Sequence, residues 1–346
     1  MNLNVSPTPS SRAGGCTLTG ALSVVTQVRD AACIIHGPKG CAHHNFSLLH
    51  ATGLDNERLA VPDLVSTALA ESDIVFGGEQ ALARTIDSVC SRDVAAVFIL
   101  STCIVETIGD DVDAVCSAAQ GIPVIHIPTA GFLGGTFEDG VNKALITLAG
   151  LAEPRPSGRA VNIIGEKNLE YEVEENYAEV ARLLTHLGLP VGIRYINNIT
   201  LEDISLIGNA RLNILRDPAL LPVGRYLQER FGTPFIPSFP AGLSDTLAFI
   251  GSTAALCQAD AGRALAIERE LQAEILADFS DICDCHGVFS GLVSDAGSSK
   301  TARETADALH IRISAESGDP LLPIQPVVGS AGVRRMLHRW RRALHA

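Results

Sequence analysis

The chain has 346 residues, of which 47% are hydrophobic and 19% are charged, and its formal net charge at pH 7 is −13. The composition is too apolar for a disordered protein, and the length allows two or three packed domains. The acidic balance argues against nucleic acid or a membrane as the main partner. The sequence shows no apolar run of membrane-spanning length and no signal peptide, so we expect a cytoplasmic protein with reduced cysteines.

The first structured region leads into a cysteine. After a polar arm over residues 1–13, apolar spacing predicts a helix over 20–30 and a strand over 31–36. The strand runs into Gly37-Pro-Lys-Gly40, a turn in which two glycines allow a sharp reversal. Cys41 follows at the predicted start of a helix, where oriented N–H groups favour a thiolate.

Strands and helices then alternate. Further strands are predicted over residues 74–77, 95–101 and 123–127, with helices over 79–90 and 108–119. This order predicts an α/β fold with a parallel sheet covered on both faces. Ligand-binding groups gather at the carboxyl ends of such strands, and Cys41 and Cys103 each follow one.

Strands and helices also alternate in the rest of the chain. A proline-rich linker near residues 153–158 ends an N-terminal Rossmann-like domain at residue 152. Residues 159–241 read as a second Rossmann-like domain. Residues 242–346 read as a helical segment, a short third βαβ unit and a basic C-terminal helix over 329–344.

Three cysteines share one kind of setting. Cys16, Cys41 and Cys103 lie in turns flanked by glycine, serine or threonine rather than in apolar runs. Thiolates in such turns can hold iron, so the three predict one metal site. The alternative is three unrelated buried thiols.

Several other residues have structural alternatives. Cys283-Asp-Cys285-His286 lacks the two-residue gap of a metal site, so packing is the better interpretation. His43 and His44 follow the cysteine turn, where they could donate protons or bind a ligand; exposed helix positions are the alternative. We expect Glu106, Asp110 and Asp111 to cap a helix, and His36 to fix loop geometry.

The motifs around these residues carry a resemblance. Gly-Cys at 15–16, His-Gly-Pro-x-Gly-Cys at 36–41, Ser-Thr-Cys at 101–103 and Ile-Gly-Asp-Asp at 108–111 resemble the catalytic components of nitrogenases and nitrogenase-like reductases. Within that family, the short length and the Cys-Ala-His-His-Asn-Phe continuation are most similar to the catalytic subunit of the Ni-sirohydrochlorin a,c-diamide reductive cyclase of coenzyme F430 biosynthesis.

The resemblance implies a function. Cys16, Cys41 and Cys103 would bind a 4Fe-4S cluster at the interface of a homodimer, either shared on the two-fold axis or one per chain. A separate homodimeric ATP-binding 4Fe-4S reductase would supply electrons for reduction of a nickel tetrapyrrole substrate and closure of a lactam. This chain itself has no Gly-x-x-x-x-Gly-Lys-Ser/Thr, and Ala296-Gly-Ser-Ser-Lys-Thr301 reads better as a helix start.

Two rival functions remain open. One is another nitrogenase-like reductase, acting on a chlorophyll precursor or a sulfur compound with a distinct second subunit. The other is a non-catalytic scaffold on which a metallocluster is assembled and then passed on.

Overall fold

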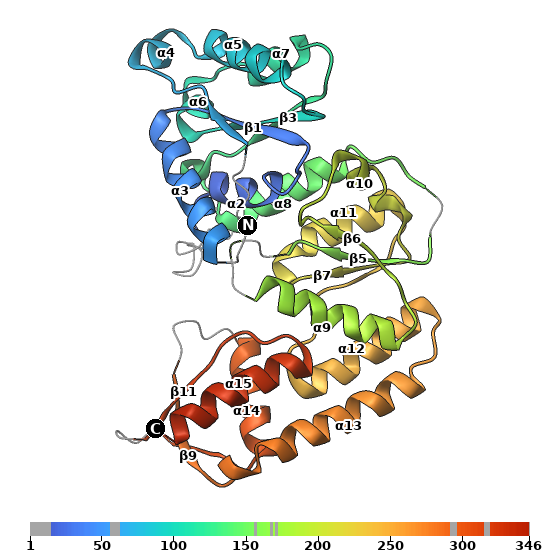
Figure 1. Cartoon of the computed structure of the whole chain (residues 1–346). Helices are drawn as coiled ribbons and strands as arrows, with labels where there is room; N and C mark the ends of the chain where they lie inside the picture. Colours follow the sequence, from blue (N-terminus) through green and yellow to red (C-terminus); the bar gives the residue numbers. More distant parts are fainter. Residues whose placement is uncertain are drawn as a thin grey trace, which may run out of the picture. The chain divides into compact units, whose positions relative to one another are not determined.

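A computed structural model of the chain describes residues 15–55, 63–155, 158–166, 169, 172–290, 296–314 and 319–345. Contacts divide the chain into two compact units (Figure 1). Unit 1 comprises residues 1–158, 162–172 and 192–235, and unit 2 the remainder. The predicted three-domain boundaries stay a prediction. Among the described residues, no helix combines the length and apolar character that crossing a bilayer requires.

Unit 1 is built on a parallel sheet in the order β2-β1-β3-β4. Its strands are β1 (Ala31–His36), β2 (Leu64–Ser66), β3 (Ala96–Ser101) and β4 (Val124–Pro128). The helices around it are α2 (Thr17–Val25), α3 (Lys39–Asp55), α4 (Glu71–Phe76), α5 (Glu79–Cys90), α6 (Cys103–Ile108), α7 (Val112–Ala118) and α8 (Phe137–Ala149). A 3-10 turn, η1 (Gly131–Leu133), precedes α8.

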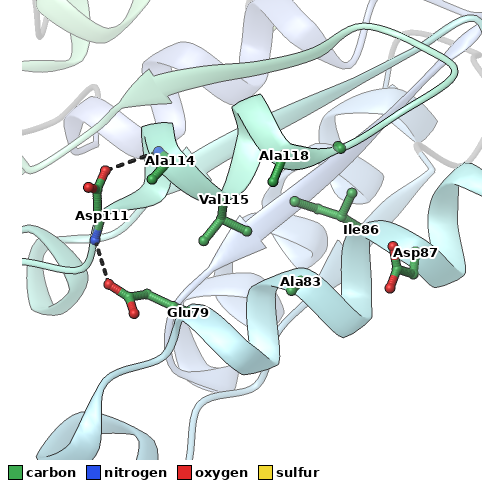
Figure 2. Close-up of a pocket in the computed structure, with 9 residues that line it drawn as sticks. Glu79, Ala83, Ile86, Asp87, Asp111, Ala114, Val115 and Ala118 are labelled. Atoms are coloured by element: carbon green, nitrogen blue, oxygen red, sulfur yellow. Dashed lines mark hydrogen bonds between the residues drawn. The ribbon is translucent and has the colours of Figure 1, made fainter.

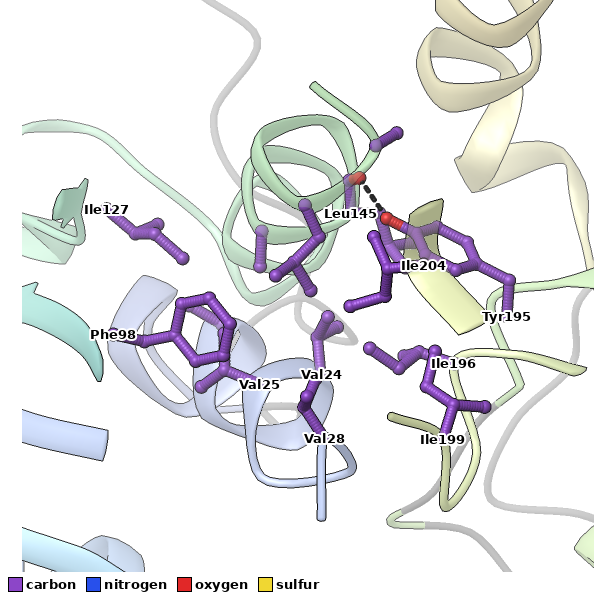
Figure 3. Close-up of a cluster of buried hydrophobic side chains, with 14 of the residues drawn as sticks. Val24, Val25, Val28, Phe98, Ile127, Leu145, Tyr195, Ile196, Ile199 and Ile204 are labelled. Carbon is purple, nitrogen blue, oxygen red and sulfur yellow. Dashed lines mark hydrogen bonds between the residues drawn. The ribbon is translucent and has the colours of Figure 1, made fainter. Parts of the chain in front are cut away.

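The sheet is apolar on both faces, as predicted for covered parallel strands. Cys33 and Phe98, which are register partners, pack into one buried cluster, while Ile34 and Ile99 pack into the other. This follows from the two-residue alternation of side chains along a strand. The first cluster continues into α2, α8 and the loop after β6, and Figure 3 shows Val24, Leu145 and Tyr195 within it.

A second four-stranded sheet lies for most of its length in unit 1, in the order β6-β5-β7-β8. Its strands are β5 (Val161–Ile164), β6 (Val191–Tyr195), β7 (Leu212–Leu215) and β8 (Phe235–Ile236), with α10 (Leu201–Ser205), the 3-10 turns η2 (Ile207–Asn209) and η3 (Pro218–Leu220), and α11 (Leu221–Phe231) between them.

Unit 2 combines helices with a small sheet. Strand β9 (His286–Ser290) pairs in parallel with β10 (Arg312–Ile313) and β11 (Leu321–Pro323). The helical elements are α9 (Val173–His186), α12 (Gly242–Cys257), α13 (Gly262–Asp278), η4 (Ser280–Ile282), α14 (Ala296–Ala308) and α15 (Gly329–Leu344). Residues 296–301 lie at the start of α14, so the helical interpretation of Ala296-Gly-Ser-Ser-Lys-Thr301 is confirmed.

Two secondary-structure predictions are wrong. Residues 74–77 were predicted as a strand, but they lie at the end of α4, whose first turn is closed by the Asp73 carboxylate accepting from the Ala70 N–H at 2.9 Å. The predicted helix over 108–119 starts too early: Ile108 is the last residue of α6, which Gly109 ends with a left-handed φ of 79°, and α7 begins at Val112. The sequence did not predict β2, which has only three residues.

Candidate metal centre

The three predicted cysteines come together at the edge of unit 1. Cys16 precedes α2, Cys41 is the third residue of α3, and Cys103 opens α6 directly after β3. The Cys41 thiol interacts electrostatically with both of the others. Strand order explains this, because β1 and β3 are neighbours and their last residues, His36 and Ser101, lie side by side.

The turn η1 joins two of these cysteines. The Phe132 N–H donates to Cys103 Sγ at 3.3 Å, and a Cβ placed on Gly131 would lie 3.2 Å from Cys16 Cβ. An amide donor to sulfur favours the thiolate that a metal needs. Glycine at 131 therefore lets the backbone approach Cys16 while the next residue supports Cys103.

The surroundings of Cys41 favour its thiol in the absence of a cluster. Burial raises the pKa of Cys41, and the charges of Cys16 and Cys103 raise it further. These effects oppose the helix N-terminus, which we expect to favour the thiolate. Three thiolates would repel one another, and a cationic iron cluster removes that repulsion when it binds.

The chemistry of the donor set suits an iron–sulfur cluster, because such clusters are held by cysteine thiolates. The described residues contain no group of three or more His, Cys, Asp or Glu side chains placed to hold one metal ion. Buried oxygens without a hydrogen-bond partner among the described residues belong to residues next to or one turn from these cysteines: Thr17 Oγ1, Thr102 Oγ1 and Asn45 Oδ1.

The two predicted catalytic histidines lie beside this site. His43 and His44 are both exposed on α3, two and three residues after Cys41. Their position is compatible with contact to a ligand at the cysteine edge and equally with an ordinary solvated helix face. Their catalytic role stays a prediction.

His36 is a buried structural residue. Its Nδ1 lies 3.1 Å from Thr67 Oγ1 and its Nε2 3.2 Å from Asp110 Oδ2. Burial lowers the pKa of His36, and Asp110 only partly opposes this. The Asp110 carboxylate also accepts from the Gly78 N–H, while Asp111 caps α7 by accepting from the Ala114 N–H at 3.0 Å. Loop fixing by His36 and capping by Asp111 are thus confirmed.

The sequence did not reveal a second polar group at the same sheet edge, formed by Ser101, Glu106, Asp113 and His126. The only sign of this group in the sequence was His126, a histidine inside the apolar strand predicted over residues 123–127.

The remaining features lie elsewhere. A shallow groove of about 490 Å³ lies between α5 and α7 (Figure 2). It is lined by Ala83, Val115 and other small residues, with Glu79 and Asp111 at one end, and none of the three cysteines lines it. Cys283 and Cys285 pack against the core of unit 2, which supports their predicted structural role.

The fold and this cysteine site define an α/β protein with an iron–sulfur type ligand set. The family described as Nitrogenase component 1 type Oxidoreductase matches residues 16–292, and the chain belongs to that family.

Relatives and solved structures agree with this assignment. The chain is 32% identical over 250 residues to the nitrogenase iron-molybdenum cofactor biosynthesis protein NifE of Nostoc sp. (strain PCC 7120 / SAG 25.82 / UTEX 2576), covering 68% of this chain and 50% of that protein. It is 32% identical over 298 residues to NifE of Klebsiella pneumoniae, covering 78% and 63%. The chain thus spans about half to two thirds of these relatives. The solved structure "Nitrogenase Cp1 at pH 5" matches with a TM-score of 0.66 at 22% identity, covering 86% of this chain and 63% of that one, which shows the fold.

Proposed function

We propose that this chain is the cluster-binding subunit of a nitrogenase-like system, with Cys16, Cys41 and Cys103 as ligands of a 4Fe-4S cluster. The convergence of the three thiols at one sheet edge carries this proposal. When bound, the cluster supplies one-electron transfer. A cubane usually takes four thiolates, and two arrangements in a homodimer satisfy this: one cluster on the two-fold axis takes an equal number of cysteines from each copy, or each chain binds its own cluster through three cysteines and a fourth ligand comes from elsewhere.

The chain's own residues then have distinct tasks. Phe132 N–H stabilises the Cys103 sulfur, and Gly131 keeps the backbone close to Cys16. A separate homodimeric ATP-binding 4Fe-4S reductase would deliver the electrons.

Within this role, we propose reduction of a nickel tetrapyrrole, Ni-sirohydrochlorin a,c-diamide, coupled to lactam formation on the route to coenzyme F430. The exposed His43 and His44 next to Cys41 support it, because imidazole N–H groups can donate hydrogen bonds to a substrate rich in carboxylates. The motif continuation Cys-Ala-His-His-Asn-Phe is the sequence feature that favours this substrate.

A second candidate is a scaffold on which a metallocluster is built and then passed to another protein. The NifE relatives favour it, since their name describes cofactor biosynthesis. An exposed Cys16 is compatible with release of a cluster.

Anaerobic reconstitution with iron and sulfide tests the shared part of both candidates. We expect a cubane EPR signal after reduction that Cys16→Ala, Cys41→Ala and Cys103→Ala each abolish or alter. Cys90→Ala, another free cysteine of unit 1, should leave it unchanged. Absence of the signal in the wild type, or equal effects of all four changes, would contradict the proposal.

A second assay separates the candidates. The reconstituted chain receives Ni-sirohydrochlorin a,c-diamide, ATP and a matched reductase, and the absorbance of the pigment is followed. Conversion of the pigment supports the cyclase. An unchanged pigment together with loss of iron to an apo acceptor protein supports the scaffold.

A further inference from the structure

Four polar side chains form one hydrogen-bonded chain beside the cysteine edge. Ser101 ends β3, and its hydroxyl donates to Glu106 Oε1 in α6. Ser101 Oγ also lies 2.8 Å from Nε2 of His126, which sits in the neighbouring strand β4. On the other side of that ring, Nδ1 lies 2.8 Å from Oδ1 of Asp113 in α7. Four elements of unit 1 therefore contribute one residue each.

The four hydrogen-bonded side chains differ in their exposure to solvent. The side chain of Asp113 is 82% exposed, those of His126 and Glu106 are 9% and 26% exposed, and Ser101 is fully buried. Glu106 lies one helical turn after Cys103 on α6, and residues three apart on a helix share a face. The hydrogen bonds thus connect the exposed Asp113 to the partly exposed Glu106, which lies on the same helix as the proposed cluster ligand Cys103.

The distances also match those of a Ser-His-Asp hydrolase, but the surroundings do not. A nucleophilic serine needs an accessible oxygen whose proton goes to the histidine. Ser101 is buried, and its hydroxyl proton is directed to Glu106. Proton transfer is the chemistry that this arrangement supports.

We propose that Ser101, Glu106, His126 and Asp113 store one proton and deliver it through Glu106 to the reaction at the cysteine edge. The inference rests on the proposed function, because reduction of a substrate by several electrons consumes protons.

The transfer balances in protons and charge. In the first arrangement the ring is an imidazolium: Nδ1–H donates to Asp113, Nε2–H donates to Ser101, and Ser101 donates to ionised Glu106. In the second, Nε2 has passed its proton to Ser101, and Ser101 has passed its own to Glu106. Two bonds to hydrogen break, two form, and one positive charge leaves the ring. Glu106 then gives its proton to the substrate, and the substrate takes its electron from the reductase. The ring regains a proton at Nε2 from hydronium in the solvent, which leaves water.

Other charged groups surround the relay. His36 interacts electrostatically with His126, and Glu79 and Asp110 act on His36. His36 is held by hydrogen bonds to Thr67 and Asp110, so it does not belong to the chain of transfer.

The first test needs no cluster. NMR of the full-length chain, with the glutamate carboxyl and histidine ring labelled, follows Glu106 and His126 across a pH series. We expect both signals to follow one common two-step curve, because the two groups share a proton. Ser101→Ala should separate them into two independent curves, and Glu106→Gln should remove one step from the His126 curve. Ser117→Ala, which removes an exposed hydroxyl of α7, is the control. Independent curves in the wild type would overturn the proposal.

The second test asks whether the relay serves the cluster. In the reconstituted protein, one proton per electron makes the midpoint potential fall by up to about 59 mV per pH unit. Glu106→Gln should flatten this slope, whereas Glu71→Gln, an exposed first-turn glutamate of α4, should keep it. A slope that persists in Glu106→Gln would refute delivery to the cluster. A wild type that forms no cluster would refute the proposed function instead, and the first test would still decide whether the relay exists.

Discussion

Helices α2 and α8 cross at two glycines, and this contact gives the sharpest prediction for stability. A Cβ placed on Gly20 would lie 2.0 Å from the Phe137 carbonyl oxygen, and one on Gly140 would lie 2.0 Å from the Thr17 carbonyl oxygen. Both obstacles are backbone atoms, which cannot rotate away as a side chain can. Gly20→Ala or Gly140→Ala must therefore push the helices apart.

Two effects of opposite sign set the magnitude. Overpacking a well-packed contact costs about 1–3 kcal/mol, whereas replacing glycine by alanine inside a helix returns about 1 kcal/mol. The obstacles are backbone atoms 2.0 Å away, so the overpacking cost lies at the upper end of its range, and we expect each substitution to lower the free energy of unfolding by about 2 kcal/mol. Gly251→Ala in α12 is the matched control, because a Cβ there meets nothing within 4 Å, and it should raise stability by about 0.5–1 kcal/mol.

Urea unfolding followed by circular dichroism measures the effect. The midpoints of Gly20→Ala and Gly140→Ala should fall with an unchanged slope, while the midpoint of Gly251→Ala should rise. Because α2 begins directly after Cys16, the first two variants should also retain less iron after reconstitution. Midpoints that rise in all three variants would refute the close helix contact.

Three further predictions address other parts of the chain. Arg182→Ala should destabilise unit 2 by about 3–5 kcal/mol in thermal unfolding, because it leaves the fully buried Glu268 carboxylate without its ion pair, and adding Glu268→Gln should recover part of the loss. Burial raises the pKa of Cys116 to about 11, so between pH 9 and 11 the native state keeps this thiol protonated while the unfolded chain loses the proton. The free energy of unfolding should therefore fall by up to about 2 kcal/mol over this pH range. It should fall less in Cys116→Ala. The double variant Cys283→Ser with Cys285→Ser should leave the iron content after reconstitution unchanged, since both cysteines pack against an apolar core. A lower iron content in this variant would show that one of the two cysteines binds iron.

Local chemistry made much of the fold and of the site predictable. The strand over 31–36 and the helices over 79–90 and 329–344 appear with the predicted bounds, because apolar spacing and flanking turns mark them. The cysteine turns were recognisable for the same reason, since glycine and hydroxyl residues stand directly beside each thiol. The meeting of Cys41 and Cys103 at one edge followed from the general rule for parallel strands, whereas Cys16 follows no strand and the rule does not place it.

The hydrogen-bonded relay was not predictable from local signals. Ser101 and His126 are 25 residues apart, and they meet only because β4 pairs with β3 in a register that sets His126 opposite Ile99. Sequence patterns located both strands without specifying which strands are neighbours. Glu106 was expected to cap a helix, because a carboxylate in a first turn has that role by default.

One buried hydrogen bond has a consequence for electron transfer. The Tyr195 hydroxyl, at the end of β6, donates to the Leu145 carbonyl of α8 at 2.5 Å (Figure 3). Helix α8 in turn is locked by glycine contacts to α2, whose first residue follows Cys16. The Cys16 sulfur is thus anchored to a framework that includes both sheets of unit 1. As a ligand of the proposed cluster, a cysteine anchored in this way would move little when the cluster gains or loses an electron, which would lower the reorganisation energy of the transfer. Loosening Tyr195, for example as Tyr195→Phe, would act on the rate of electron passage from a distance, without touching a ligand.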